Sequence, residues 1–321
     1  MKLGVFTPVF GHLDCAAMLK AVQRLRHVEA LELGTGCWPG ASHIEVDRLL
    51  ADAGAAQDYV ARIADAGLSI AALSCHGNPL HPDAAVARTA DETFGKTVRL
   101  AERLGVKTVV TFSGCPGDGP GATRPNWVTV AWPPEFAEIL EWQWTDVAIP
   151  YWTRTAQFAA DHGVRVALEA HPGFLVYNTE SALRLRAAAG PNLGVNFDPS
   201  HFWWQGMDPW AAIRALGPAI FHAHAKDVAL DAANIAVNGV LDAKSYRRIA
   251  ERSWTFRSVG WGHDELAWKQ IVSALRLAGY DGVLSIEHED ALASVDEGLG
   301  AAVDLLHRVV LKEPPVEAWW T

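Results

Sequence analysis

The feature that most constrains the fold is an alternation of short apolar runs with amphipathic segments, repeated eight times along the chain. The predicted strands lie at 3–6, 30–33, 69–74, 108–112, 165–169, 194–198, 220–224 and 282–287. They are mostly apolar on both faces, which is typical of parallel strands buried beneath helices. The predicted helices lie at 14–25, 45–66, 83–104, 135–162, 179–189, 208–216, 264–277 and 290–310. Eight βα units predict a (β/α)8 TIM barrel.

An open, doubly wound sheet is the alternative architecture, but no glycine-rich phosphate turn follows the first strand. A length of 321 residues suits one barrel. We therefore expect a single domain over 1–312 and a tail over 313–321, whose Trp319 and Trp320 pack against the barrel or a neighbouring subunit. The connections 113–134 and 227–263 are unusually long, and either enclose a substrate or form oligomer contacts.

Composition narrows the classes of function. The net charge of −10 argues against a protein built to hold nucleic acid, because phosphate binding needs a basic surface. No apolar run is long enough to span a membrane, and the first residues lack the pattern of a signal peptide. The four cysteines are isolated and show no zinc-type spacing. We expect a cytoplasmic protein that acts on small molecules and not at a membrane.

The segment Asp198-Pro-Ser-His201 ends the sixth predicted strand with a carboxylate and an imidazole. Asp-Pro-Ser is also an ordinary turn and helix-cap sequence, so the segment alone leaves a cap and a ligand site open. Three other predicted strands end in a similar way, with Glu169, His224 and Glu287. Because the carboxyl ends of barrel strands meet at one mouth, these four side chains are expected to converge there.

Three converging carboxylates would repel one another, and a bound divalent cation resolves this repulsion. An oxygen-rich set with one imidazole favours Mn²⁺, Mg²⁺ or Co²⁺ over structural zinc. We therefore predict one metal ion held by Glu169, Asp198, His224 and Glu287. Mn²⁺ is the expected ion, with Mg²⁺, Co²⁺ and Zn²⁺ as alternatives.

This strand-end pattern resembles the xylose isomerase-like barrel superfamily, in particular its sugar isomerase and epimerase branch with the tagatose and psicose 3-epimerases and the inosose enzymes. The resemblance covers essentially the whole chain and implies that the four strand-end residues bind the metal. It also implies that Glu169 and Glu287 act as acid and base on opposite faces of the substrate. Many barrels of this branch are dimers or tetramers, so a homo-oligomer is expected.

Endonuclease IV is a DNA-repair relative with similar strand ends. At the end of the fourth strand it needs a histidine, where this chain has Thr111-Phe-Ser-Gly-Cys115. The missing ligand and the acidic charge disfavour a nuclease.

Further side chains at the mouth are candidates for contact with a substrate. His201 is expected to contact a substrate hydroxyl or carbonyl, and the segment 259–263 resembles the glycine-containing stretch that precedes the seventh helix of the family. The full set of expected substrate contacts is His201, His76, Lys226, Glu32, Trp203 and His263. Structural roles remain open for His76, Lys226 and Glu32. His222 and His288 are expected to face away from the mouth because strand pleating alternates side chains.

The predicted reaction is proton transfer at a carbon next to a carbonyl, through an enediolate that the metal stabilises. Return of the proton on the other face gives epimerisation, and return to the neighbouring carbon gives isomerisation. A lyase or deglycosidase acting on a 3-keto sugar or glycoside is the alternative, because it begins with the same acidic C–H bond. A barrel that binds a sugar without turnover is the second alternative.

Overall fold

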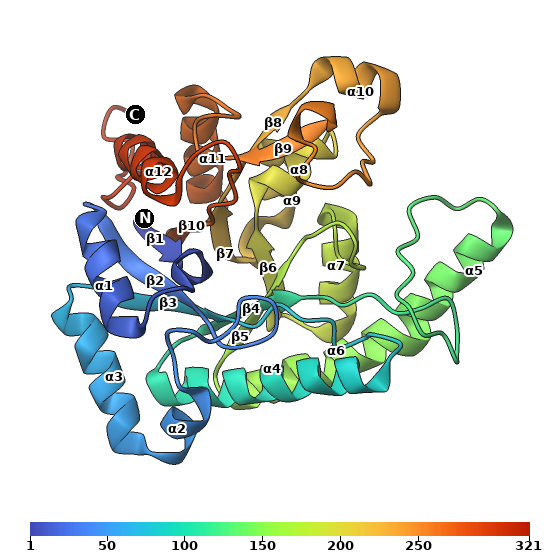
Figure 1. Cartoon of the computed structure of the whole chain (residues 1–321), viewed down its shortest axis with the longest axis horizontal. Helices are drawn as coiled ribbons and strands as arrows, with labels where there is room; N and C mark the ends of the chain where they lie inside the picture. Colours follow the sequence, from blue (N-terminus) through green and yellow to red (C-terminus); the bar gives the residue numbers. More distant parts are fainter.

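The computed structural model describes all 321 residues and closes eight parallel strands into a barrel (Figure 1). The barrel strands are β1 (Lys2–Phe6), β2 (Val28–Gly34), β3 (Ser69–Ser74), β4 (Thr108–Phe112), β5 (Arg165–Glu169), β6 (Leu193–Phe197), β7 (Ile220–Ala225) and β10 (Val283–Ile286). They follow one another around the barrel in this order, and β10 pairs with β1 to close it. The predicted (β/α)8 barrel is confirmed.

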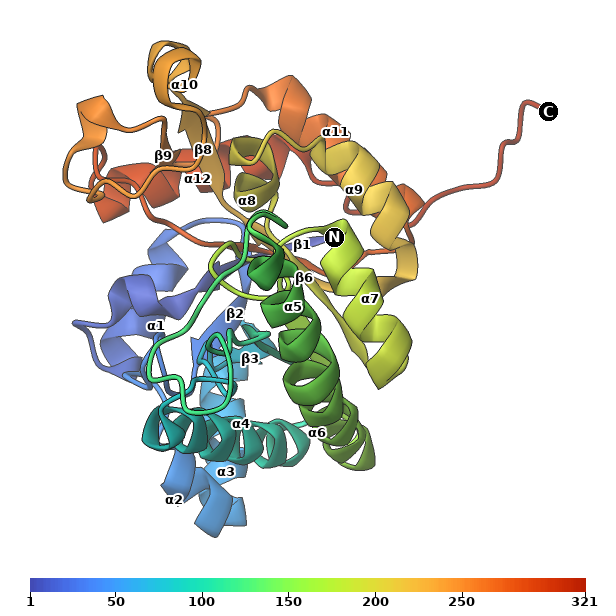
Figure 2. The same cartoon turned by 90° about the vertical axis from the view of Figure 1, so that its right-hand side faces the viewer.

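Helices follow the strands and cover the outside of the barrel (Figures 1 and 2). They are α1 (Cys15–Arg24), α2 (Val46–Ala51), α3 (Ala53–Asp65), α4 (Ala84–Leu104), α5 (Pro134–Trp142), α6 (Ile149–Asp161), α7 (Thr179–Ala189), α8 (Pro199–Trp204), α9 (Pro209–Leu216), α10 (Ala232–Asn238), α11 (Glu265–Leu277) and α12 (Val295–Val309). A π-helical segment, η2 (Gln143–Ala148), joins α5 to α6, and short 3-10 turns lie at η1 (Thr7–Phe10), η3 (Gly217–Ala219) and η4 (Ile249–Glu251).

Two predicted helices differ from the observed ones in a way that side-chain capping explains. The segment 45–66 divides at Asp52, whose carboxylate accepts hydrogen bonds from the amides of Gly54 and Ala55 and so begins α3. The last helix begins at Val295 rather than near Asp290, with Ser294 as its N-cap. Asp290 is instead bound to Ser258, Arg257 and the amide of Leu292. The segment 290–294 is therefore a loop at the mouth of the barrel.

The core has two parts. Most buried apolar side chains lie in one continuous cluster that includes Leu31, Trp152 and Ile271 and joins the strands to their helices. Inside the barrel, a small cluster of Ala72, Val110 and Ala167 packs against the ring of Phe221. Small residues suit this position because barrel strands approach closely around the axis.

The two long connections differ in structure. The connection after β7 contains the antiparallel hairpin of β8 (Asp227–Leu230) and β9 (Trp254–Arg257), with α10 between them. The connection after β4 has no regular structure before α5, and Gln143 anchors it by donating to the carbonyls of Gly117 and Asn126 at 2.8 and 2.7 Å.

The segment after α12 runs away from the barrel (Figure 2). Trp319 and Trp320 are exposed and contact each other edge to face, so they do not pack on the barrel. None of the helices combines the length and apolarity that crossing a bilayer requires.

Candidate active site and metal centre

Asp198 shows how the local sequence builds the site. It follows β6 directly, and its Oδ1 accepts a hydrogen bond of 2.8 Å from the amide of Ser200, which caps α8. Its Oδ2 is fully buried and has no hydrogen-bond partner. The cap and the ligand interpretations of the sequence are therefore compatible, because each oxygen of the carboxylate can serve one of them.

Four strand ends bring Glu169, Asp198, His224 and Glu287 together. One ligand atom from each lies within 4.8 Å of every other, and all four residues are buried. Burial raises the pKa of Asp198. Burial also opposes ionisation of Glu287, but the charges of Lys226 and His224 lower its pKa to about 2. The cluster thus brings three buried carboxylates close together, an arrangement that a bound cation would stabilise.

These residues fit a divalent metal ion. Asp198 Oδ2 is buried and has no hydrogen-bond partner in the protein, which is rare for a buried polar atom. Glu287 Oε2 and His224 Nδ1 are also buried and lie 3.0 Å from each other. Three carboxylates and one imidazole form the kind of ligand set that binds Mn²⁺, Mg²⁺, Co²⁺ or Zn²⁺. The donor set itself does not select one of these ions.

Glu32 lies behind this cluster rather than in a cavity. Its buried carboxylate accepts hydrogen bonds from His224 Nε2 at 3.0 Å and from His222 Nε2 at 2.8 Å, and also from the hydroxyl of Ser74. The expectation that His222 faces away is wrong. Residues 222 and 224 are two apart on one strand and therefore share a face. His288, the other residue expected to face away, lines the outer part of the cavity.

Two other imidazoles surround Glu169. His76 Nε2 lies 3.0 Å from Glu169 Oε2, and His201 Nε2 lies 3.3 Å from Glu169 Oε1 and 3.4 Å from Asp198 Oδ2. Burial alone would raise the pKa of Glu169, but His201 and His76 hold it well below its usual range. His76 lines the cavity, whereas His201 is 1% exposed and lies between two of the candidate ligands.

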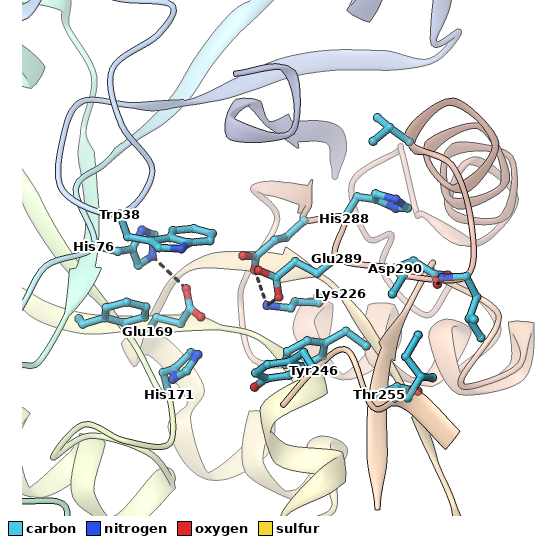
Figure 3. Close-up of a pocket in the computed structure, with 17 residues that line it drawn as sticks. Trp38, His76, Glu169, His171, Lys226, Tyr246, Thr255, His288, Glu289 and Asp290 are labelled. Atoms are coloured by element: carbon cyan, nitrogen blue, oxygen red, sulfur yellow. Dashed lines mark hydrogen bonds and ion pairs between the residues drawn. The ribbon is translucent and has the colours of Figure 1, made fainter. Parts of the chain in front are cut away.

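A cavity of about 630 Å³ opens above the cluster (Figure 3). Glu169, Glu287 and Lys226 are among the residues that line it. Lys226 Nζ lies 2.7 Å from Glu289 and 3.3 Å from Glu287, and 4.2 Å above the ring of Phe256. Of the two long connections, the one after β7 contributes side chains to this cavity, and the one at 113–134 does not.

His171 also lines the cavity, and the sequence reasoning did not single it out. Its Nδ1 lies 2.6 Å from the carbonyl oxygen of Pro172, so Nδ1 carries the proton and Nε2 has the free lone pair. Burial lowers the pKa of His171 to about 3, which keeps the ring neutral. The spacing of His171 could have identified it as a site residue, since His171 follows Glu169 by two residues and so continues the same face of the strand.

Trp203 and His263 lie outside the cavity lining. Their rings stack on each other with centroids 3.7 Å apart, and His263 Nδ1 lies 2.8 Å from Asp227 Oδ1. Asp227 Oδ2 accepts hydrogen bonds from the amides of Gly260, Gly262 and His263. These contacts fix the loop 258–263 against the barrel.

Comparison with known proteins shows the family to which the chain belongs. Residues 28–308 match the family model of the xylose isomerase-like TIM barrel. The uncharacterized protein YfiH of Bacillus subtilis is 40% identical over 313 residues, which cover 97% of this chain and 99% of YfiH.

Solved structures share the fold at low sequence identity. The probable 3-DHS dehydratase AsbF of Bacillus anthracis has a TM-score of 0.67 at 19% identity, covering 96% of this chain and 99% of AsbF. The IolI protein with a bound zinc atom has a TM-score of 0.65 at 19% identity, covering 98% and 100%. A D-tagatose 3-epimerase-like protein has a TM-score of 0.62 at 21% identity, covering 96% and 98%. The chain belongs to the xylose isomerase-like TIM barrel family.

Proposed function

We propose that this protein is a metal-dependent enzyme that isomerises or epimerises a sugar by removing a proton from a carbon next to a carbonyl. The observation that carries the proposal is the position of Glu169 and Glu287. Each belongs to the candidate metal cluster and also lines the cavity. A carboxylate in both places can meet the substrate close to the atoms on which charge develops.

The roles of the residues follow from their positions. A bound divalent ion would polarise the substrate carbonyl and stabilise the negative charge that develops on its oxygen. Glu287 or Glu169 takes the proton from the neighbouring carbon, and the other glutamate returns a proton. His76 holds Glu169 in place, and Lys226 offers an ammonium group beside Glu287.

Hydrogen exchange tests this function directly. Metal-loaded protein is incubated in D₂O with a panel of ketoses, inososes and 3-keto glycosides, and deuterium at the carbon next to the carbonyl is measured by NMR. We expect exchange with at least one compound, and a loss of roughly 10²–10⁴-fold in Glu169→Gln and Glu287→Gln at equal metal occupancy. Glu265→Gln, which changes a surface carboxylate, is the control. Exchange that survives in both active-site variants would refute the acid and base assignment.

Elimination is the second candidate function, and His171 is the observation that favours it. Its imidazole lines the cavity two residues beyond Glu169 with the Nε2 lone pair free, so it adds a polar contact beside the substrate that epimerisation between two glutamates does not need. AsbF, whose structure shares the fold, is described as a probable dehydratase. If this protein eliminates water or an alcohol, the product is an unsaturated ketone that absorbs in the ultraviolet. His171→Gln should then slow this absorbance change while metal binding persists, and an undiminished rate would exclude a role for His171 in elimination.

A further inference from the structure

One end of the cavity lies at the candidate metal ligands and is called the polar end, although Trp38 and Phe112 also line it. The other end is called the apolar end, although His288 and Asp290 lie there too. At the polar end lie His76 and two of the candidate metal ligands, Glu169 and Glu287. Figure 3 shows His76 beside Glu169. Its volume of about 630 Å³ is within the range of roughly 300–1,000 Å³ that is typical of sites for drug-sized ligands. A free hexose is smaller than such ligands and would leave much of the cavity filled with water.

The apolar end lies between two segments at the mouth. Tyr246, Ile249 and Phe256 come from the connection after β7, and Leu292 and Val295 come from the segment after β10. Leu292 and Tyr246 are 60% and 57% exposed, although both line the cavity. Large apolar side chains that are exposed and line a cavity beside a polar site are suited to contact an apolar part of a ligand.

Charge excludes a phosphate from this cavity. Lys226 is its only lysine or arginine, and its ammonium group is already shared between Glu287 and Glu289. Asp290, at the apolar end, is bound by Arg257 and by Ser258. Away from the candidate metal ligands, a phosphoryl group would therefore meet several carboxylates and no free lysine or arginine.

We propose that the substrate is a sugar ketone that carries a neutral, apolar substituent of about ring size, such as the aglycone of a keto-glycoside. The sugar lies at the polar end, and the substituent lies between Leu292 and Tyr246. Only the ketone in this proposal rests on the proposed function. The preference for an apolar substituent concerns binding and does not depend on the reaction.

Equilibrium binding to the metal-loaded protein tests the proposal independently of catalysis. The probes are methyl glucoside, phenyl glucoside and methyl glucoside 6-phosphate, which have no ketone and so cannot react by the proposed chemistry. We expect phenyl glucoside to bind at least roughly tenfold more tightly than methyl glucoside, the effect of burying one ring, and the phosphate to bind most weakly. Equal binding of the phenyl and methyl compounds, or tightest binding of the phosphate, would overturn the proposal.

A pair of leucines provides the matched variants. Leu292→Gln should weaken the binding of phenyl glucoside and leave the affinity for methyl glucoside unchanged. Leu266→Gln, at a leucine that is also 60% exposed but lies on α11 outside the cavity lining, should change neither. The molar mass of both variants is measured by light scattering. If Leu292→Gln alone lowers the mass of an oligomer, a second copy of the chain covers this end and the proposal is wrong.

Discussion

Glu32 is the residue whose position explains most about the candidate metal site. It is fully buried, and it accepts a hydrogen bond from the Nε2 atom of His224. A carboxylate behind a metal-binding imidazole fixes which ring nitrogen carries the proton and turns the other toward the metal. His224 Nδ1 faces Glu169 and Glu287, 3.4 and 3.0 Å away. With the proton kept on Nε2 by Glu32, Nδ1 would give its lone pair to an ion bound between these carboxylates. We therefore infer that Glu32 positions His224 for metal binding.

This role predicts a change in metal affinity. Glu32→Gln replaces an acceptor by an amide that can no longer pair with both His222 and His224 in the same way. We expect the affinity for Mn²⁺ to fall by about 10–100-fold, measured by calorimetric titration of the folded protein. Glu102→Gln, which alters a glutamate–histidine pair at the surface, serves as the control. Unchanged affinity in Glu32→Gln would mean that Glu32 stabilises the barrel without positioning His224.

Single residues also show which parts of the site could not be predicted from the sequence. The approach of Glu169, Asp198, His224 and Glu287 was predictable, because strand ends of a barrel meet at one mouth. The location of Glu32 beneath His224 was not, since it depends on how far each strand extends along the barrel axis. Trp203 and His263 were expected to contact a substrate, but their mutual stacking depends on the path of a loop that no periodicity describes.

At the scale of elements, buried carboxylates fix the loops of the mouth. Asp227 begins β8, and its Oδ2 accepts from three backbone amides of the loop 258–263, between 2.9 and 3.2 Å away. Asp290 receives the amide and the hydroxyl of Ser258 in the same loop. The loop therefore has two anchors from neighbouring parts of the barrel, and both are aspartates just beyond strand ends.

Removing one anchor should cost stability. Asp227→Asn keeps the size of the side chain but removes the charge and turns one acceptor into a donor that faces backbone amides. We expect the free energy of unfolding to fall by about 2–3 kcal/mol in urea denaturation. Asp264→Asn is the comparison, because Asp264 only caps α11 through the amide of Ala267 and should cost less than about 1 kcal/mol. A smaller loss in Asp227→Asn than in Asp264→Asn would contradict the anchoring role.

A glycine in the same loop allows a steric test. A Cβ atom added to Gly262 would collide with the carbonyl oxygen of Val228 and with Asp227, whereas one added to Gly119 would meet nothing within 4 Å. Gly262→Ala should therefore lower the melting temperature clearly, and Gly119→Ala should leave it within a degree or so. Equal melting temperatures, measured by circular dichroism, would show that the loop is looser than these contacts indicate.

Elements were predictable where a periodic pattern decided their type. The strands β3, β4 and β5 have the predicted bounds because each is a short, mostly apolar run that follows a glycine-containing turn. The hairpin of β8 and β9 was not predicted. Its strands pair with each other across an insertion, and such pairing carries no local signal in either strand.

At the scale of the whole molecule, the fold and the metal cluster depend on each other. The four candidate ligands come from β5, β7 and the ends of β6 and β10, which lie side by side in the barrel. The size of the cavity follows instead from the insertion after β7 and from the late start of α12 at Val295. The family pattern could predict the positions of the candidate ligands but not the size of the cavity, because insertions vary while the strand ends keep their place.

Because four adjacent parts of the barrel share the cluster, a bound ion should stabilise the whole fold. A ligand at about 100 times its dissociation constant stabilises a protein by about 2.7 kcal/mol, which for a chain of this size raises the melting temperature by roughly 5 °C. We expect Mn²⁺ to produce this shift and EDTA to reverse it. Asp198→Asn should lose the response, and Asp208→Asn, which alters the cap of α9 outside the cluster, should keep it. An equal response to Mn²⁺ in both variants would place the ion elsewhere, since Asp198 Oδ2 is a buried carboxylate oxygen of the cluster that the protein leaves without a hydrogen-bond partner.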